Sequence, residues 1–372
     1  MERVPGSGPG DDKAPRLAPG GLTEGAVRLT DHIVAERGAS RGEWDVLPAS
    51  EVGRETVRWV WPGRIPAGKL TVVEGDPATA KSTLVLDLAA RVSTGAPWPD
   101  GAAPSPPASV LLLSAEDGWG DTIRPRLEAA GADLSRCLCV AARRVEGDEG
   151  SLLRPVVLPD DIAWIARLVE SSDAALVVVD VLAAYLSDRV DSHKDQSVRR
   201  LLAQLGAAAA RTGAAVVMVR HLNKAPGGPA LYRGGGSIGI VGAARAAYAV
   251  LRDPDDPSHR LVATVKSNLA PEAPTWGYAL VEVAALGVAR IEWDRAADPR
   301  SAAELLAGLG SSALGDAVAW LGEWRATHPG EVPAARLLAD AAEAGIPPTT
   351  LHRARKQLGI ETRKTGDGWT VG

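Results

Sequence analysis

Short apolar runs alternate with helical segments along the middle of the chain. A strand formed by such a run is apolar on both faces, which is typical of parallel sheets that helices cover on both sides. The segments between the runs show helical spacing of apolar residues, as at 84–91 and 198–205. The pattern predicts an α/β domain with a mostly parallel sheet. The runs lie at residues 70–73, 110–113, 138–140, 175–179, 215–219 and 261–265.

The chain is long enough for this domain and a second, smaller one, because it has 372 residues. Its beginning is rich in glycine and proline and cannot bury enough apolar surface to offset the entropy lost on ordering. The alternation of strands and helices stops near Asp298, and largely helical text follows Ser311. We therefore predict a flexible tail at 1–43, the α/β domain at 44–298, a linker at 299–311 and a small domain at 312–372.

Charge and cysteine content limit the partners and the compartment. The net charge is −5, from 41 basic and 46 acidic residues, so any contact with nucleic acid has to be local. Cys137 and Cys139 are too close in sequence for a zinc site or an unstrained disulfide, which fits a reducing compartment. No apolar stretch approaches the ~20 residues of a membrane span, and no signal-like segment begins the chain. We expect a cytoplasmic protein without a membrane partner.

Residues 75–82 have the pattern of a phosphate-binding loop between a strand and a helix. Such a loop needs backbone N–H groups at a helix N-terminus, a lysine for the β and γ phosphates and a hydroxyl group for Mg²⁺. Gly75, Lys81 and Ser82 meet this pattern, whereas Ala80 replaces the second glycine and adds a methyl group where the backbone approaches phosphate. A chance turn is the alternative. We predict that ATP and Mg²⁺ bind at Gly75, Asp76, Pro77, Ala78, Thr79, Ala80, Lys81, Ser82 and Thr83.

Polar residues follow three of the predicted strands, at the sheet edge where α/β proteins bind ligands. Asp180 is the predicted metal-side carboxylate together with Ser82, although a turn or helix-cap aspartate is the alternative. Glu116 is the predicted general base, with Asp117 as a solvated neighbour or cap. His221 is predicted to sense the γ phosphate, and the alternative is a hydrogen-bonded histidine at a strand end. Lys81 completes this catalytic set.

The motifs at 75–82, 114–117, 176–180 and 220–224 resemble, in this order, the RecA-like ATPases related to the plasmid replication helicase RepA. These are AAA-type ATPases of phages and mobile elements. The resemblance covers residues 55–295, with further likeness at 121–127 and 232–237, and Ala80 departs from it. It implies a RecA-like fold and a homo-oligomeric ring, usually a hexamer, in which ATP lies between subunits.

The resemblance also implies an arginine that reaches the γ phosphate of the neighbouring subunit, a task that suits a planar guanidinium. Arg245 matches this position best, Arg233 and Lys266 compete with it, and a surface arginine without such a role is the alternative. A glycine pair at 227–228 and a glycine triplet at 234–236 bracket the segment around Arg233. In ring motors of this type such loops face the central channel and contact single-stranded DNA, so Arg233 is a candidate DNA-binding residue.

Residues 312–372 are predicted to form three helices and a hairpin, and they resemble a winged helix-turn-helix domain. Pro348 suits the first position of the last helix. A basic recognition helix and wing are typical of contact with duplex or forked DNA. A solvated face of a protein-docking module is the alternative. The candidate DNA-binding residues are Arg353, Arg355, Lys356, Arg363 and Lys364, with Glu361 as the acidic residue among them.

These features favour an ATP-hydrolysing motor that acts on DNA, as a replicative helicase or loader of a phage, plasmid or other mobile element. One alternative keeps the ATPase but not strand separation, as in a recombination or regulatory RecA-like protein. Another is a DNA-binding regulator in which the altered loop holds ATP as a switch with little turnover, which Ala80 would favour.

Overall fold

The structure is a computed structural model, and it describes residues 48–147, 150–190, 195–221, 239–360, 362–365 and 368–371. By its contacts the chain divides into two units, Met1–Arg54 and Glu55–Gly372. The described part of the first unit contains a short 3-10 helix, η1 (Ala49–Glu51). The predicted tail at 1–43 lies outside the described residues. No helix among the described residues is long and apolar enough to span a membrane.

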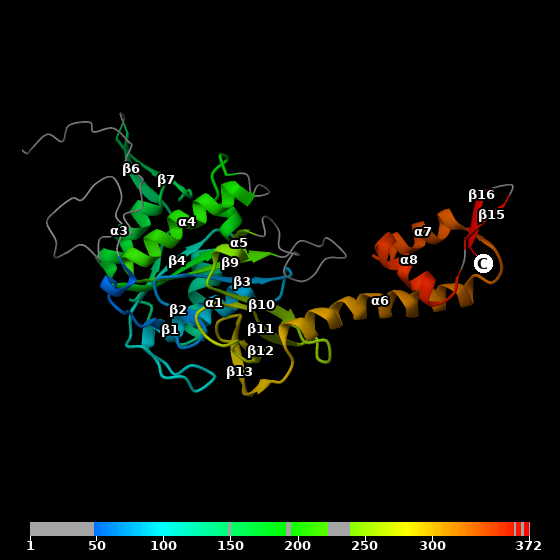
Figure 1. Cartoon of the computed structure of the whole chain (residues 1–372), viewed down its shortest axis with the longest axis horizontal. Coiled ribbons are helices and arrows are strands. Elements are labelled where there is room, and N and C mark those ends of the chain that lie inside the picture. Colours follow the sequence, from blue (N-terminus) through cyan, green and yellow to red (C-terminus); the bar gives the residue numbers. More distant parts are fainter. Residues whose placement is uncertain are drawn as a thin grey trace, which may run out of the picture. The chain divides into compact units, whose positions relative to one another are not determined.

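A nine-stranded sheet forms the centre of the second unit, in the order β13-β12-β11-β10-β3-β9-β8-β4-β5 (Figure 1). Neighbours from β10 to β5 are parallel, and β10 to β13 are joined as antiparallel pairs. The predicted α/β class with a mostly parallel sheet is confirmed. The strands are β3 (Leu70–Gly75), β4 (Ser109–Ser114), β5 (Cys137–Cys139), β8 (Ala174–Asp180), β9 (Ala215–His221), β10 (Ala246–Arg252), β11 (His259–Ser267), β12 (Thr275–Val283) and β13 (Val288–Asp298).

Helices cover both faces of the sheet, so each central strand contributes to two apolar cores (Figure 1). On β4, Val110 and Leu112 pack with one set of helices, and Leu111 and Leu113 pack with the other. This arrangement explains why the strand runs are apolar throughout. The first core contains α1 (Lys81–Thr94) and α2 (Arg124–Ala129), and the second contains α3 (Ile162–Ser172), α4 (Asp195–Thr212) and α5 (Gly239–Ala243). The π-helix η2 (Trp119–Ile123) precedes α2, and the 3-10 helix η3 (Leu182–Tyr185) follows β8.

A cluster of aromatic side chains packs between the antiparallel strands of the sheet and α1. The rings of Trp61 and Trp98 stack with centroids 4.7 Å apart, and the ring of Trp293 lies nearly perpendicular to that of Trp61 with centroids 6.0 Å apart. Tyr278 lies 5.4 Å from Trp293, whose indole N–H donates to Asp87 of α1 at 2.9 Å. Trp61 ends β1 (Trp59–Trp61), which pairs with β2 (Ile65–Pro66). The hairpin β12–β13 therefore packs against the helix that follows the phosphate loop.

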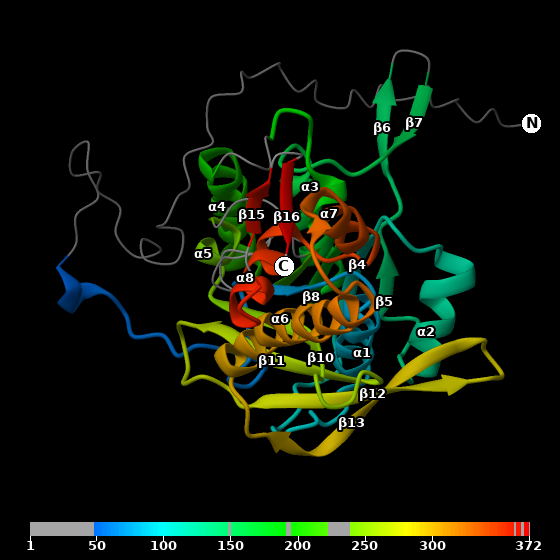
Figure 2. The same cartoon turned by 90° about the vertical axis from the view of Figure 1, so that its right-hand side faces the viewer.

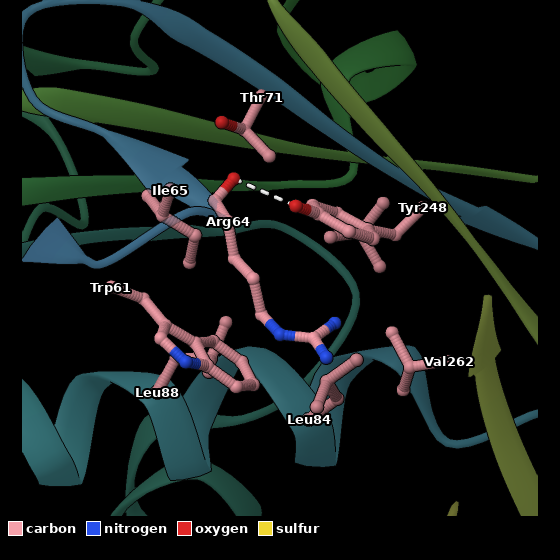
Figure 3. A pocket seen from close by; sticks show the side chains of 9 residues that line it. Trp61, Arg64, Ile65, Thr71, Leu84, Leu88, Tyr248 and Val262 are labelled. Carbon is pink, nitrogen blue, oxygen red and sulfur yellow. Dashed lines mark hydrogen bonds between the residues drawn. The ribbon is translucent and has the colours of Figure 1, made fainter. Parts of the chain in front are cut away.

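A small apolar cavity lies beneath β3, and Figure 3 shows its lining. The guanidinium of Arg64 is buried there and donates to Asp100 at 3.1 Å and to the carbonyl of Pro274 at 2.7 Å. The hydroxyl of Tyr248 donates to the carbonyl of Arg64 at 2.8 Å (Figure 3). We assign no ligand to this cavity, since its walls are otherwise almost wholly apolar.

A two-stranded ribbon, β6 (Arg143–Gly147) and β7 (Gly150–Arg154), is tied to the domain by one buried carboxylate. Asp161, fully buried just before α3, accepts hydrogen bonds from Arg143 and from Arg154, the latter at 2.6 and 2.7 Å. The backbone N–H of Val157 donates to the same carboxylate at 2.9 Å. These bonds anchor both strands of the ribbon to the start of α3.

The predicted linker differs from the structure, because most of it belongs to the long helix α6 (Ala302–Thr327). Ser301 and Glu304 form a capping box, which starts a helix by satisfying its first free N–H groups. Leu305 and Leu306 then pack with residues of β10 and β11. The capping-box residues can be recognised in the sequence. A linker was predicted there because the alternation of strands and helices ends at almost the same point.

The C-terminal module consists of the end of α6, two further helices and a small sheet of order β14-β16-β15 (Figure 2). Its core includes Leu321, Trp324, Leu337, Leu351 and Val371. The predicted helices and hairpin are present, and the last helix begins at Pro348 without a side-chain cap. The elements are β14 (Val332–Pro333), α7 (Ala334–Glu343), α8 (Pro348–Gln357), β15 (Thr362–Thr365) and β16 (Gly368–Val371).

Candidate active site

The predicted phosphate loop connects the end of β3 to the start of α1. A Cβ atom on Gly75 would lie 2.3 Å from the carbonyl oxygen of Val250 in β10, so this position requires glycine for packing within the sheet. Ala78 and Ala80 have positive φ values of 60° and 64°. Successive residues that alternate between the right-handed and left-handed helical conformations are typical of loops whose N–H groups converge on an anion. The loop thus has the backbone expected of a phosphate site.

Ala80 keeps the conformation that a glycine would adopt. It is the N-cap of α1 with φ 64° and ψ 33°, in the left-handed region. For a residue with a Cβ atom this conformation costs roughly 1–2 kcal/mol, because Cβ approaches the following carbonyl oxygen. The alanine therefore adds strain to the loop.

Lys81 lies inside the loop and is 4% exposed. Its ammonium group donates to the carbonyl oxygens of Gly75 at 3.0 Å and Asp76 at 2.7 Å. Burial lowers the pKa of Lys81, and the nearby carboxylates of Asp180, Asp76 and Glu116 oppose this shift. The lysine is thus held by backbone oxygens at the position where phosphate oxygens would bind.

Asp180 ends β8 and faces the first turn of α1. It is 6% exposed, and it accepts a hydrogen bond from the hydroxyl of Ser82. Burial raises the pKa of Asp180, the bond from Ser82 lowers it, and the charges of Glu116 and Asp117 raise it. Its Oδ1 atom is buried without a hydrogen-bond partner among the described residues.

This oxygen-rich corner fits Mg²⁺, which prefers hard oxygen ligands and takes few of them from the protein. Within the described ranges no group of three or more His, Cys, Asp and Glu side chains could hold a metal by itself. Phosphate and water oxygens would therefore have to complete the shell around Ser82 and Asp180.

Glu116 and His221 face each other from two strands of the same edge. Glu116 follows β4, His221 ends β9 beside Gly75, and Glu116 Oε1 lies 3.5 Å from His221 Nε2. Both side chains are partly open to solvent, at 52% and 38%. Asp117 pairs with Arg126 of α2 at 2.7 Å and is 30% exposed. The structure thus brings Lys81, Ser82, Asp180, Glu116 and His221 together.

A buried ion pair beside the loop was missed from the sequence. Arg220 of β9 contacts Glu74 of β3 through Nε at 2.8 Å and Nη2 at 2.5 Å, and the side chains are 5% and 2% exposed. Burial raises the pKa of Glu74, and the charge of Arg220 opposes this shift. The sequence does contain a signal for this pair, because Glu74 directly precedes Gly75 and Arg220 directly precedes His221, each near the end of a predicted strand.

Two residues of the antiparallel strands also contact the loop and were not predicted. Arg252, at the end of β10, donates to the carbonyl of Ala78 at 3.2 Å. The hydroxyl of Tyr278 lies 3.3 Å from the carbonyl oxygen of Thr79 and 3.4 Å from that of Ala80. These contacts join residues that are far apart in the sequence, so no local sequence pattern predicts them.

Arg245 and Lys266 lie at the end of the sheet where β3 begins, opposite the end that carries the phosphate loop. The N–H of Arg245 bonds to the carbonyl of Leu70, at the start of β3, whereas the loop follows its end. Five residues of extended strand span roughly 16 Å. Arg245 is exposed, and Lys266 donates to the carbonyls of Val241 and Gly242 at 2.9 and 2.8 Å. Arg233 lies outside the described residues.

Among the predicted DNA-binding residues of the C-terminal module, Arg353, Lys356 and Arg363 are exposed. Arg355 is partly buried and donates to the hydroxyl of Thr362 at 3.0 Å, which connects α8 to β15. The side chain of Lys364 lies outside the described residues. The basic residues thus differ in their exposure, and Arg355 is already engaged in a hydrogen bond within the module.

Comparison with known proteins identifies the domain. A family model described as an AAA domain matches residues 42–227, which is half of the chain and includes the loop, Glu116, Asp180 and His221. The family implies nucleotide binding and ATPase activity in general. A comparison with curated proteins finds no match. On this match, and with a phosphate loop at the edge of a mostly parallel sheet, the chain belongs to the AAA-domain family of P-loop ATPases.

Proposed function

We propose that the chain is an ATP-driven motor that acts on DNA, as a replicative helicase or loader of a phage, plasmid or other mobile element. The observation that carries the catalytic part is the convergence of Lys81, Ser82, Asp180, Glu116 and His221 at one sheet edge. A lysine for the phosphates, a carboxylate on the metal side and a residue that activates water are the groups that P-loop enzymes use to hydrolyse a nucleotide.

Each residue has a task in this proposal. The phosphate oxygens of ATP take over from the carbonyls of Gly75 and Asp76 as partners of Lys81. Ser82 and Asp180 would hold Mg²⁺, which neutralises charge on the β and γ phosphates when bound. Glu116 accepts a proton from the attacking water. His221, 3.5 Å from Glu116, senses the γ phosphate through this neighbour.

We propose that ATP binds between the subunits of a ring, built of six copies as is usual in the ring ATPases that the chain resembles, with Arg245 acting on the neighbour's nucleotide. Its place at the sheet edge opposite the loop supports a role outside its own site. Lys266 is the weaker candidate, since its ammonium group already bonds to two carbonyls of α5. Arg233 keeps its proposed role in contacting single-stranded DNA in the channel.

We further propose that the C-terminal module is a winged helix-turn-helix that binds duplex or forked DNA. The order α7, α8 and the β15–β16 hairpin supports this, as do the exposed Arg353 and Lys356 on α8 and Arg363 on the hairpin. A positively charged helix beside a charged hairpin matches the phosphate backbone of DNA.

The test measures ATP hydrolysis with and without single-stranded DNA, together with the size of the assembly in Mg²⁺ and nucleotide. A DNA motor hydrolyses ATP faster with single-stranded DNA, assembles into a ring and unwinds a forked duplex. Stimulated hydrolysis without unwinding would favour a recombination or regulatory ATPase. Tight ATP binding with almost no turnover would favour a nucleotide switch, the alternative that the strained Ala80 supports.

A further inference from the structure

The phosphate loop is held from the side of β12 by one buried hydroxyl group. Tyr278 is fully buried, and its hydroxyl lies 3.3 Å from the carbonyl oxygen of Thr79 and 3.4 Å from that of Ala80. A phenol has a single proton, so these two oxygens share it. A buried hydroxyl without a partner would cost about 1–3 kcal/mol, which makes the two carbonyls its required acceptors.

The two carbonyls belong to the peptide groups that carry the N–H groups of Ala80 and Lys81. In a planar trans peptide the C=O and N–H bonds point in opposite directions. A hydroxyl that holds the oxygens of Thr79 and Ala80 on one side therefore directs the following N–H groups to the other side. That is the side on which a nest of N–H groups binds phosphate.

This interaction matters here because Ala80 lies in the left-handed region at φ 64°. Glycine enters this region without cost, whereas alanine leaves it for the right-handed or extended regions unless it is held. When residue 80 leaves this region, the peptide groups on its two sides rotate and the N–H groups lose their common direction. The N–H of Leu84 already holds the Ala80 oxygen at 3.0 Å, so the distinct contribution of Tyr278 is a donor to the Thr79 oxygen on the other side of residue 80.

The hydroxyl of Tyr278 is well placed to supply this hydrogen bond, because its ring cannot move freely. The ring lies 5.4 Å from Trp293, and the indole N–H of Trp293 donates to Asp87 of α1 at 2.9 Å. The same hairpin thus contacts the loop and the helix that follows it. Burial raises the pKa of Tyr278, so its hydroxyl stays a donor at neutral pH.

We propose that Tyr278 is a positioning residue that holds the alanine-containing phosphate loop in its nucleotide-binding conformation. The proposal rests on the proposed function, since it assumes that the loop binds ATP. It assigns a role in nucleotide binding to the antiparallel strands, which lie beyond residues 42–227 of the family match.

The test is Tyr278→Phe, which keeps the ring and removes only the hydroxyl. We expect the affinity for a fluorescent ATP analogue with Mg²⁺ to fall about 5-fold, as for the loss of one hydrogen bond. The KM for ATP should rise by a similar factor, with a smaller change in kcat. Tyr248→Phe is the matched control, because it also loses a buried hydrogen bond, to the carbonyl of Arg64, but not one to the loop.

The double variant Ala80→Gly/Tyr278→Phe separates positioning from general stability. Glycine removes the strain, so this variant should bind the analogue within about 2-fold of Ala80→Gly alone. Equal affinity of Tyr278→Phe and the unmodified chain would overturn the proposal. A 5-fold loss that persists in the double variant would overturn it as well.

Folding and the proposed function are checked separately. Thermal unfolding compares Tyr278→Phe with Tyr248→Phe, and if Tyr278→Phe alone does not fold, the double variant decides. The proposal predicts that the double variant folds and binds, whereas its failure to fold would assign Tyr278 a purely structural role. Absence of binding by the unmodified chain would instead refute the proposed function.

Discussion

At the scale of single residues, the site depends on polar groups that are buried to different degrees. Lys81 and Asp180 are almost fully buried, whereas Glu116 is half exposed. A buried lysine and a buried carboxylate suit the binding of phosphate and metal, which need a fixed geometry while the bond to the γ phosphate breaks. A half-exposed glutamate suits a group that must meet an incoming water molecule.

The first prediction concerns Glu116→Gln, which keeps the shape of the side chain and removes its ability to accept a proton. We expect ATP to bind with little change, while single-turnover hydrolysis slows about 10²-fold or more. Asp117→Asn is the control, because Asp117 pairs with Arg126 at 2.7 Å and should affect hydrolysis much less. Wild-type hydrolysis by Glu116→Gln would mean that the base lies elsewhere.

The second prediction concerns Arg245, which is proposed to act on a neighbouring subunit. Lys81→Ala and Arg245→Ala proteins should each be inactive, because one lacks the lysine that binds phosphate and the other lacks the arginine. Mixed before assembly, they should regain part of the activity, since some interfaces pair an intact loop with an intact arginine. The ATPase rate of the mixture measures this. If co-assembly is demonstrated and no activity returns, Arg245 is not the trans-acting residue, and the same mixture with Lys266→Ala becomes the next test.

At the scale of elements, the ribbon β6–β7 depends on the charge of a single buried residue. Burial raises the pKa of Asp161, but bonds from Arg154, Val157 and Arg143 outweigh it and hold the pKa below its ordinary value of 3.8. A carboxyl group with a lowered pKa stabilises the fold above its ordinary pKa. This contribution is lost as the pH falls through 3.8 toward the lower pKa of the folded state.

The third prediction follows from this anchor. Asp161→Asn should lower the free energy of unfolding by about 2 kcal/mol at pH 7, as for lost bonds to a charged group. The difference from the unmodified chain should shrink as the pH falls below about 4 and Asp161 takes up a proton, because the protonated carboxyl group is then neutral like the asparagine. Urea unfolding at a series of pH values measures it, with the exposed Asp160→Asn as control. A difference that does not change with pH would show that the charge of Asp161 contributes little.

The sequence predicted most of the strands in which nearly every side chain is apolar. The strands β3, β4, β5, β8 and β9 were predicted because residues such as 110–113 are apolar on both faces, and the strand ends located Glu116, Asp180 and His221. The strand β10, which pairs in parallel with β3, was not predicted, although it is buried over most of its length. The half-exposed strands β12 and β13 were missed because they mix polar and apolar residues. The hydrogen bond of Tyr278 to the loop was not predictable, because it depends on how the sheet folds back over α1.

At the scale of the whole molecule, the proposal divides the work between the ATPase domain and the C-terminal module. Arg353 and Lys356 are exposed on α8, while Arg355 bonds to Thr362 within the module. The first two should therefore bind DNA phosphates, and Arg355 should contribute mainly to the stability of the module.

The fourth prediction tests this division. The full-length double variant Arg353→Ala/Lys356→Ala should bind forked DNA more weakly, and the slope of log affinity against log salt should fall by up to about 2, one for each DNA phosphate that is no longer neutralised. The ATPase rate without DNA should not change. Arg336→Ala on α7 is the control for loss of charge, since Arg336 faces Asp340 at 3.7 Å. Unchanged fork binding and salt dependence would leave the module a protein-docking or structural element.

The ion pair between Glu74 and Arg220 has a mechanical consequence. Sliding β3 past β9 by one residue would separate two buried charges, and breaking such a pair costs about 3–5 kcal/mol. The strand under the loop and the strand that ends at His221 therefore behave as one rigid body during a cycle of hydrolysis. In the proposed motor, a conformational change driven by hydrolysis would therefore displace β3 and β9 together, and neither strand would slide along the other.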